Sequence, residues 1–182
     1  MAYDLLVQNG RIVDGSGMPA FMGDVAVRHG KIVEVGKLSG QATRTIDAAG
    51  LVVAPGFIDN HCHYDAQVFW DPLCSFSCYH GATTVIFGNC SLGLAPVQSA
   101  FGIYDRGLIR PGMAADLTIF DADTVQPLPE DIVHDFPNNG WRIREQAQGI
   151  AYTVVNGTVL IEHGEHTGAL PGRIHRNALY AV

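Results

Sequence analysis

Residues 55–65 read Pro55-Gly56-Phe57-Ile58-Asp59-Asn60-His61-Cys62-His63-Tyr64-Asp65. They follow the apolar residues 51–53, and we predict one buried strand that continues through Ile58 and ends at the two histidines. Because side chains alternate between the two faces of a strand, His61 and His63 are predicted to point the same way. Two neutral imidazoles on one face are a suitable pair of zinc ligands. The alternative is that the two histidines are merely exposed at a strand end. The buried strand before them favours the interpretation as metal ligands.

A second apolar run follows at residues 81–87, Gly81-Ala82-Thr83-Thr84-Val85-Ile86-Phe87. Its β-branched residues are typical of a buried parallel strand. Cys90 comes just after it and is either a zinc ligand, as a thiolate, or a small buried apolar side chain. Two parallel strands that each end in metal-binding residues are typical of the opening unit of an α/β barrel. A whole barrel needs roughly 200 to 250 residues, so only a fragment fits here.

The other three cysteines are assigned to packing. Cys62 lies between the two histidines, and alternation turns it to the opposite face of the strand. Cys74 and Cys78 have a Cys-x-x-x-Cys spacing, but no second pair completes a structural zinc site. The chain start has no basic segment followed by an apolar core, so we expect no secretory signal and a cytoplasmic location. In the cytoplasm, clustered cysteines indicate reduced thiols or metal ligands rather than disulfides.

Other titratable residues near these motifs have simpler explanations. Asp59 and Asp65 flank the histidines, and either could orient an imidazole or cap a turn, of which the turn is favoured. His163 and His166 lie in a polar segment after a strand and are predicted to form a solvated loop. The sequence contains neither a supported Ser-His-Asp arrangement nor a glycine-rich phosphate loop. We therefore assign no catalytic and no cofactor-binding residue.

Both ends of the chain are rich in β-strand patterns. Three hairpins are predicted, over residues 3–13 with a turn at Asn9-Gly10, over 24–35 with a turn at His29-Gly30, and over 151–161 with a turn at Asn156-Gly157. Such pairs mark hairpins because both turn residues take a positive φ. Residues 116–120 form a further predicted strand.

The predicted fold is mainly β. It consists of a composite β-sandwich from both chain ends and a fragment, the first strands, of an α/β TIM-type barrel. The predicted boundaries are residues 1–54 for the N-terminal half of the sandwich, 55–100 for the barrel fragment with the metal-ligand motifs, and 101–182 for the C-terminal half and tail. An ordinary β-sandwich is the simpler alternative.

Composition excludes several classes of function. Hydrophobic residues make up 47% of the 182 residues and charged residues 16%, which is typical of a globular protein. The net charge of −7 argues against nucleic acid as a partner, because nucleic acid favours basic surfaces. No apolar run approaches the roughly 20 residues that cross a bilayer, so no membrane partner is expected.

Several motifs resemble those of a known family. Residues 55–63 resemble the first-strand motif of the amidohydrolase superfamily. Residues 4–13, 24–35 and 109–117 resemble the two halves of its accessory β-sandwich. Residues 63–72, residues 88–90 with 94–97, and residues 164–173 narrow the resemblance to the N-acyl-D-amino-acid deacylase (D-aminoacylase) branch. Together these motifs cover nearly the whole chain.

The resemblance implies a metal-dependent amide hydrolysis. In that family a metal-bound hydroxide attacks the acyl carbonyl of an N-acyl-D-amino acid, and a carboxylate passes the water's proton to the leaving amine. Zinc acidifies the water and polarises the carbonyl. His61 and His63 match the family's paired histidine ligands, and Cys90 matches its cysteine ligand. A small N-acyl amino acid is the substrate that this implies for the parent enzyme.

The resemblance is interrupted in the middle of the chain. The family's later barrel strands supply two more histidine ligands and the aspartate base, and no segment here resembles them. After residues 94–97, the chain passes within a few residues to 101–105, which resembles the entry into the second half of the sandwich. Two hypotheses follow: a hydrolase whose barrel is missing here, or a non-catalytic remnant whose exposed apolar surface drives homo-oligomerisation. In both cases we expect this chain alone to be inactive and to hold zinc weakly.

Overall fold

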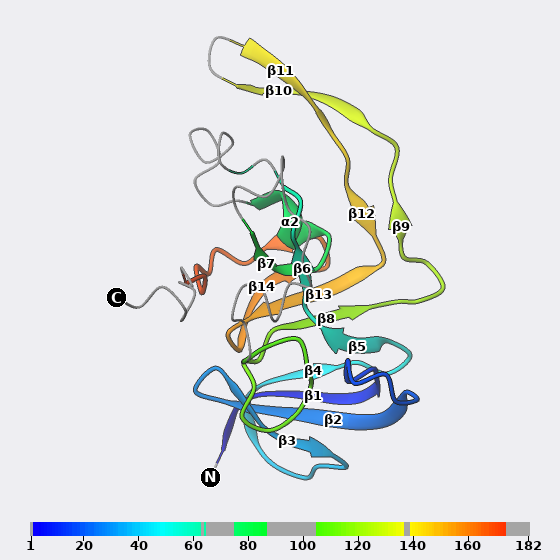
Figure 1. Cartoon of the computed structure of the whole chain (residues 1–182), viewed down its shortest axis with the longest axis vertical. Coiled ribbons are helices and arrows are strands. Elements are labelled where there is room, and N and C mark those ends of the chain that lie inside the picture. The colour runs from blue at the N-terminus through cyan, green and yellow to red at the C-terminus, as the bar shows by residue number, and fades with distance from the viewer. Residues whose placement is uncertain (1, 63, 65–74, 87–104, 137–138, 174–182) are drawn as a thin grey trace.

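A computed structural model describes the chain except for residues 1, 63, 65–74, 87–104, 137–138 and 174–182. Nine strands of the described residues form one mixed sheet, in the order β15-β14-β13-β8-β5-β1-β2-β3, with β4 paired to β1 (Figure 1). They are β1 (Tyr3–Ile12), β2 (Phe21–Arg28), β3 (Lys31–Gly36), β4 (Ala42–Asp47), β5 (Val52–Pro55), β8 (Leu117–Phe120), β13 (Ile150–Val155), β14 (Thr158–Glu162) and β15 (Glu165–His166). The mainly β fold is confirmed, and no closed barrel occurs among the described residues.

The two ends of the chain meet at β5. This strand pairs in parallel with the second half of β1 and antiparallel with β8, where Val53 lies opposite Ile119. A single core of buried apolar residues lines the inner face, and it includes Leu5 and Val25 from the N-terminal end and Leu117 and Val154 from the C-terminal end. Because burial of this apolar surface drives folding, both ends of the chain stabilise one another. The exact domain boundaries stay a prediction.

Two predicted hairpin turns are confirmed and pack against each other. His29-Gly30 joins β2 to β3, and Asn156-Gly157 joins β13 to β14, with φ positive at all four residues. A Cβ on Gly30 would lie 2.8 Å from the carbonyl oxygen of Asn156, and one on Gly157 would lie 2.9 Å from Cα of Gly30. Glycine is therefore required at both positions by the contact as well as by the turn. Ala115 joins the two turns, because its N–H donates to Gly30 O and its carbonyl accepts from Gly157 N, both at 2.9 Å.

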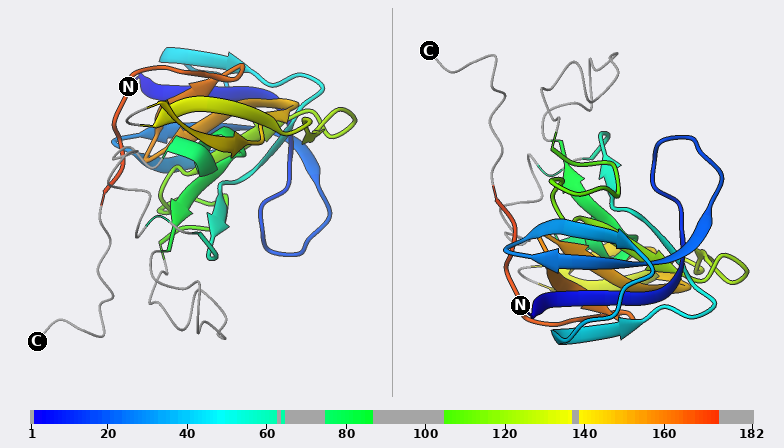
Figure 2. Two further views of the ribbon diagram at one scale, coloured as in Figure 1. Left: turned by 90° about the horizontal axis from the view of Figure 1, so that it is seen from above. Right: turned by 90° about the horizontal axis from the view of Figure 1, so that it is seen from below.

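The predicted hairpin at Asn9-Gly10 is wrong. The chain does not reverse there; β1 runs straight through, and its antiparallel partner is β2, which follows a long loop (Figure 2). Asn9 does take a positive φ of 61°, but at an irregularity of the pairing between Val7 and Gly10. The carboxylate of Asp24 accepts the freed N–H of Asn9 at 2.8 Å, so the irregularity is satisfied within the sheet.

The predicted single strand over residues 51–58 is also wrong. The chain forms two short strands in different sheets, β5 and β6 (Phe57–Asp59), which separate at Gly56. The N–H of Gly56 still donates to Asp116 O at 2.9 Å, whereas the N–H of Phe57 already donates to Gly81 O at 3.1 Å. A Cβ on Gly56 would lie 2.1 Å from the Thr83 side chain, so only glycine permits this crossing.

A small second layer lies on the outer face of the main sheet (Figure 2). It comprises β6, the short helix α2 (Ser75–Tyr79) and β7 (Ala82–Val85), and β6 and β7 pair in parallel as the sequence predicts. Most of β7 is only half-buried, and β6 is the only strand among the described residues that pairs with it. None of the helices in the described part of the chain has the length and apolarity that a bilayer-spanning segment requires.

Two buried threonines attach this layer to the main sheet. Thr118 of β8 and Thr153 of β13 alternate with core residues and therefore face the outer side. The hydroxyl of Thr118 donates to Gly81 O at 2.6 Å, and that of Thr153 donates to Cys78 O at 3.0 Å. Each carbonyl also accepts one backbone N–H at 3.1 Å, Cys78 O from Gly81 and Gly81 O from Phe57, so the threonine hydroxyl is its second donor.

Replacing Thr118 or Thr153 with valine is expected to lower the free energy of unfolding by about 0.5 to 1.5 kcal/mol each, because one of the two hydrogen bonds that each carbonyl accepts is lost. Urea denaturation followed by circular dichroism measures the loss. Thr158→Val is the matched control, since Thr158 is exposed on the neighbouring strand β14. Equal stability of the buried and exposed variants would contradict the anchoring role.

A ribbon projects from the body of the molecule (Figure 1). It consists of the hairpin β10 (Asp131–Phe136) and β11 (Gly140–Arg144), with β9 (Gln126–Pro127) and β12 (Ala147–Gln148) pairing at its base. The guanidinium of Arg142 lies 4.2 Å from the ring centre of Phe76 in α2, so one side of the ribbon contacts the second layer. Ile132, Trp141 and Ile143 are 64%, 61% and 56% exposed. No sequence pattern identified this ribbon in advance.

Candidate metal site

The parallel pairing of β6 and β7 brings the ends of both strands to one edge. Asp59 lies opposite Val85, and the N–H of Ile86 donates to Asp59 O at 2.9 Å. Residues that follow the two strands therefore start from neighbouring points. His61 follows β6 and is exposed at this edge, as expected for a residue that binds a ligand from solution.

The other two predicted ligands, His63 and Cys90, lie outside the described residues. Their convergence with His61 therefore stays a prediction. Among the residues that the structure does describe, no group of three or more histidine, cysteine, aspartate or glutamate side chains could hold a metal ion. The chemistry of the predicted donor set nevertheless fits zinc, which binds imidazole nitrogens and thiolate sulfurs.

Asp59 shapes the turn that carries His61. Its Oδ1 accepts the backbone N–H of His61 at 3.2 Å, and its Oδ2 accepts the hydroxyl of Ser77 at 2.6 Å. The favoured interpretation of Asp59 as a turn residue agrees with this geometry. The corresponding prediction for Asp65 lies outside the described residues.

Tyr64 and Ser77 support the same turn, and sequence analysis did not single them out. The buried Tyr64 hydroxyl accepts the N–H of Ser77 at 2.7 Å and donates to Ser77 Oγ at 3.0 Å. Tyr64 directly follows the histidine motif, which could have drawn attention to it. Ser77 carries no such signal, because only the tertiary structure brings α2 to the end of β6.

The predicted packing role of Cys62 is confirmed. Its side chain is buried, and its sulfur lies 3.3 Å from Ile86 O, to which the thiol donates. This contact links the histidine turn to the end of β7. Cys78 is also buried, at the end of α2, whereas Cys74 lies outside the described residues.

The prediction of a solvated loop at His163 and His166 needs correction. His163 and Gly164 form a tight turn, with φ of 48° and 83°, and His166 belongs to β15. Two consecutive residues with positive φ reverse the chain within two positions, so a hairpin replaces the loop. His163 Nε2 lies 3.1 Å from the Tyr152 hydroxyl, and the rings meet edge to face. Both histidines therefore belong to the hairpin of β14 and β15.

Comparison with known proteins shows a similarity to one family. Residues 44–98 match the profile of the Amidohydrolase family. The chain is 42% identical over 99 residues to D-aminoacylase from Alcaligenes xylosoxydans xylosoxydans, covering 54% of this chain and 20% of that protein. It is also 42% identical over 96 residues to N-acyl-D-aspartate deacylase of the same organism, covering 52% of this chain and 19% of the relative.

A related protein has been solved by crystallography. N-acyl-D-glutamate deacylase from Bordetella bronchiseptica, complexed with zinc and a phosphonate inhibitor, is 39% identical and has a TM-score of 0.48, over 53% of this chain and 20% of that chain. The present chain thus spans about a fifth of the length of the relatives that it matches. Residues 44–98 thus match the amidohydrolase family, and about half of the chain is similar to D-aminoacylases.

Proposed function

We propose that the second layer of this chain is the metal-binding part of a D-aminoacylase-type amidohydrolase, in which His61, His63 and Cys90 bind zinc. The observation that carries this proposal is the parallel pairing of β6 and β7. It starts the segments that lead to His61 and Cys90 from adjacent points of one edge. The zinc complex of the similar Bordetella deacylase supports the choice of metal.

The substrate class that we propose for the whole enzyme is the N-acyl-D-amino acids, after the names of the related deacylases. When bound, zinc would supply a Lewis acid that activates water and polarises an acyl carbonyl. The residues of this chain would hold the metal at the strand edge. We assign no general base within the chain, and therefore expect no turnover from these residues alone.

Zinc content tests the proposed ligands. We expect the purified chain to bind zinc weakly but measurably and His63→Ala to bind it at least about tenfold more weakly, because even outer partners of metal ligands contribute this much. Elemental analysis and a chelator titration measure both. His29→Asn is the control, since His29 is 89% exposed in the turn between β2 and β3, away from the strand edge. Equal zinc content in wild type and His63→Ala would refute the proposed zinc site.

Activity is tested separately with N-acetyl-D-methionine. We expect no measurable hydrolysis by the zinc-loaded chain, because it lacks an assigned base to take the proton from water. A rate above that of zinc alone, lost in His63→Ala, would contradict this expectation. It would place the complete catalytic machinery within these 182 residues.

The second candidate function is a non-catalytic module that associates with other copies of itself. The exposed Ile132, Trp141 and Ile143 of the ribbon favour it, because clustered exposed apolar side chains mark interaction surfaces. Sedimentation velocity should then show a dimer or larger species that Trp141→Lys dissociates. A monomer at every concentration would eliminate this candidate and leave the zinc proposal unaffected.

A further inference from the structure

A directed chain of hydrogen bonds runs from α2 to the backbone of His61. The N–H of Ser77 donates to the Tyr64 hydroxyl, which donates to Ser77 Oγ, which in turn donates to Asp59 Oδ2. The other carboxylate oxygen, Oδ1, accepts the backbone N–H of His61. Each hydroxyl both accepts and donates, so the direction of every bond is set. Such chains strengthen their members, and this one ends on a carboxylate, which accepts stronger bonds than a neutral oxygen.

The same network is attached to the main sheet. The Thr153 hydroxyl binds Cys78 O, the residue that follows Ser77 in α2. On the other side, the backbone of Asp59 and the thiol of Cys62 both bond to Ile86 at the end of β7. The turn around His61 is therefore held from α2 and from β7, although His61 itself is exposed.

We propose that Asp59 is a positioning residue for the metal site: it fixes the main chain of His61, and Ser77 and Tyr64 fix its carboxylate. The inference rests on the proposed zinc site, because it assigns His61 as a ligand. A ligand at a strand end needs such support, since an imidazole on a loose turn would lose conformational entropy upon binding. Asp59 acts here through the backbone N–H of His61.

Removing the carboxylate should loosen the turn while the main sheet stays intact. Asp59→Ala leaves the His61 N–H and the Ser77 hydroxyl without their acceptor. Ser77→Ala removes one of the two bonds that orient the carboxylate, and Ser77→Thr retains the hydroxyl. We therefore expect a large effect for Asp59→Ala, a smaller one for Ser77→Ala, and near wild-type behaviour for Ser77→Thr.

Two measurements test the inference, and the first needs no metal. In the zinc-free protein, amide hydrogen exchange by NMR should show the His61 N–H exchanging at least about tenfold faster in Asp59→Ala than in wild type. The amides of Ile119 and Val154 in the main sheet report an intact fold if their exchange is unchanged. Equal His61 exchange rates in both proteins would overturn the positioning role.

The second measurement is zinc affinity by chelator competition. Asp59→Ala should bind zinc about 10- to 100-fold more weakly, with Ser77→Thr restoring what Ser77→Ala loses. Unchanged affinity in Asp59→Ala, in a wild type that binds zinc, would overturn the inference. A wild type that binds no zinc refutes the proposed metal site instead, and the exchange rate of the His61 amide then still decides whether Asp59 holds the turn.

Discussion

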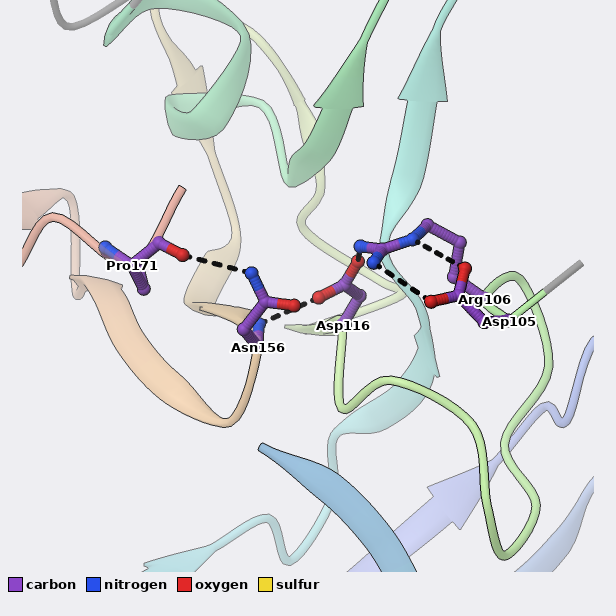
Figure 3. Close-up of polar contacts among 5 residues, drawn as sticks. All are labelled: Asp105, Arg106, Asp116, Asn156 and Pro171. Atoms are coloured by element: carbon purple, nitrogen blue, oxygen red, sulfur yellow. Dashed lines mark hydrogen bonds and ion pairs between the residues drawn. The ribbon is translucent and has the colours of Figure 1, made fainter. Parts of the chain in front are cut away.

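Replacing Arg106 with alanine is expected to lower the free energy of unfolding by about 3 to 5 kcal/mol, because the change leaves a buried carboxylate without its cation. Arg106 and Asp116 are each only 4% exposed. The Arg106 guanidinium donates from Nη1 to Asp116 Oδ2 (Figure 3). The N–H of Asn156 donates to the other oxygen at 2.7 Å, and the Asn156 side chain donates to Pro171 O at 2.9 Å. The pair thus joins β8, the β13–β14 turn and the C-terminal segment.

The loss of stability in Arg106→Ala should depend on pH. Burial raises the pKa of Asp116 above its ordinary 3.8, while the Asn156 N–H and the Arg106 guanidinium act in the opposite direction. In Arg106→Ala, which lacks the guanidinium, the folded-state pKa of Asp116 should rise further. A carboxyl whose pKa is higher in the folded than in the unfolded protein loses stability as the pH rises through the folded value. The Arg106→Ala penalty should therefore be smallest below the ordinary pKa and largest at neutral pH.

Urea denaturation at about pH 3.5 and pH 7 measures both expectations. Arg144→Ala is the control, because Arg144 pairs with Asp131 on the solvent-exposed ribbon, at 2.6 Å. Arg144→Ala should lower the free energy of unfolding much less than Arg106→Ala does. Hydrogen bonding from Arg144 lowers the pKa of Asp131, so this pair's contribution is present above the unfolded pKa and disappears as the pH falls. A pH-independent loss for Arg106→Ala would contradict the assigned cause.

Replacing Gly56 with alanine is the second change with a large expected effect, a destabilisation of about 1 to 3 kcal/mol or more. The new Cβ would lie 2.1 Å from Cγ2 and 2.6 Å from Cβ of Thr83. Since Cβ of Thr83 is itself too close, rotation of that side chain cannot relieve the overlap. The backbone must shift where the chain passes from β5 to β6, and β6 should separate from β7.

Gly172→Ala is the matched control, because a Cβ there would meet no atom within 4 Å. Thr83→Gly in the Gly56→Ala background should recover part of the stability by removing the overlapping atoms. Urea denaturation quantifies all three variants, and amide exchange of Ile86 reports the β6–β7 pairing through its bond to Asp59 O. If Gly56→Ala were as stable as Gly172→Ala, the steric account of the crossing would be wrong.

The candidate site was predictable only in part. The histidine motif, the adjoining parallel strand and the packing of Cys62 follow from side-chain alternation and apolar runs, which are local properties. The positions of His63 and Cys90 relative to His61 stay predictions. The support from Ser77 could not be predicted, because α2 is placed beside β6 by tertiary contacts, among them the bond of Thr153 to Cys78 O.

The amino-acid sequence alone determined the turns at His29-Gly30 and Asn156-Gly157, where neighbouring β-rich runs could pair across two residues with positive φ. At Asn9 the same local preference produced an irregularity inside β1, because the pairing partner was the distant β2. At Gly56 the apolar run was divided between two sheets by contacts with Asp116 and Gly81. Backbone preference is a property of a few residues, whereas strand partners are selected by the burial of apolar surface across the whole chain, and only the tertiary structure decides them.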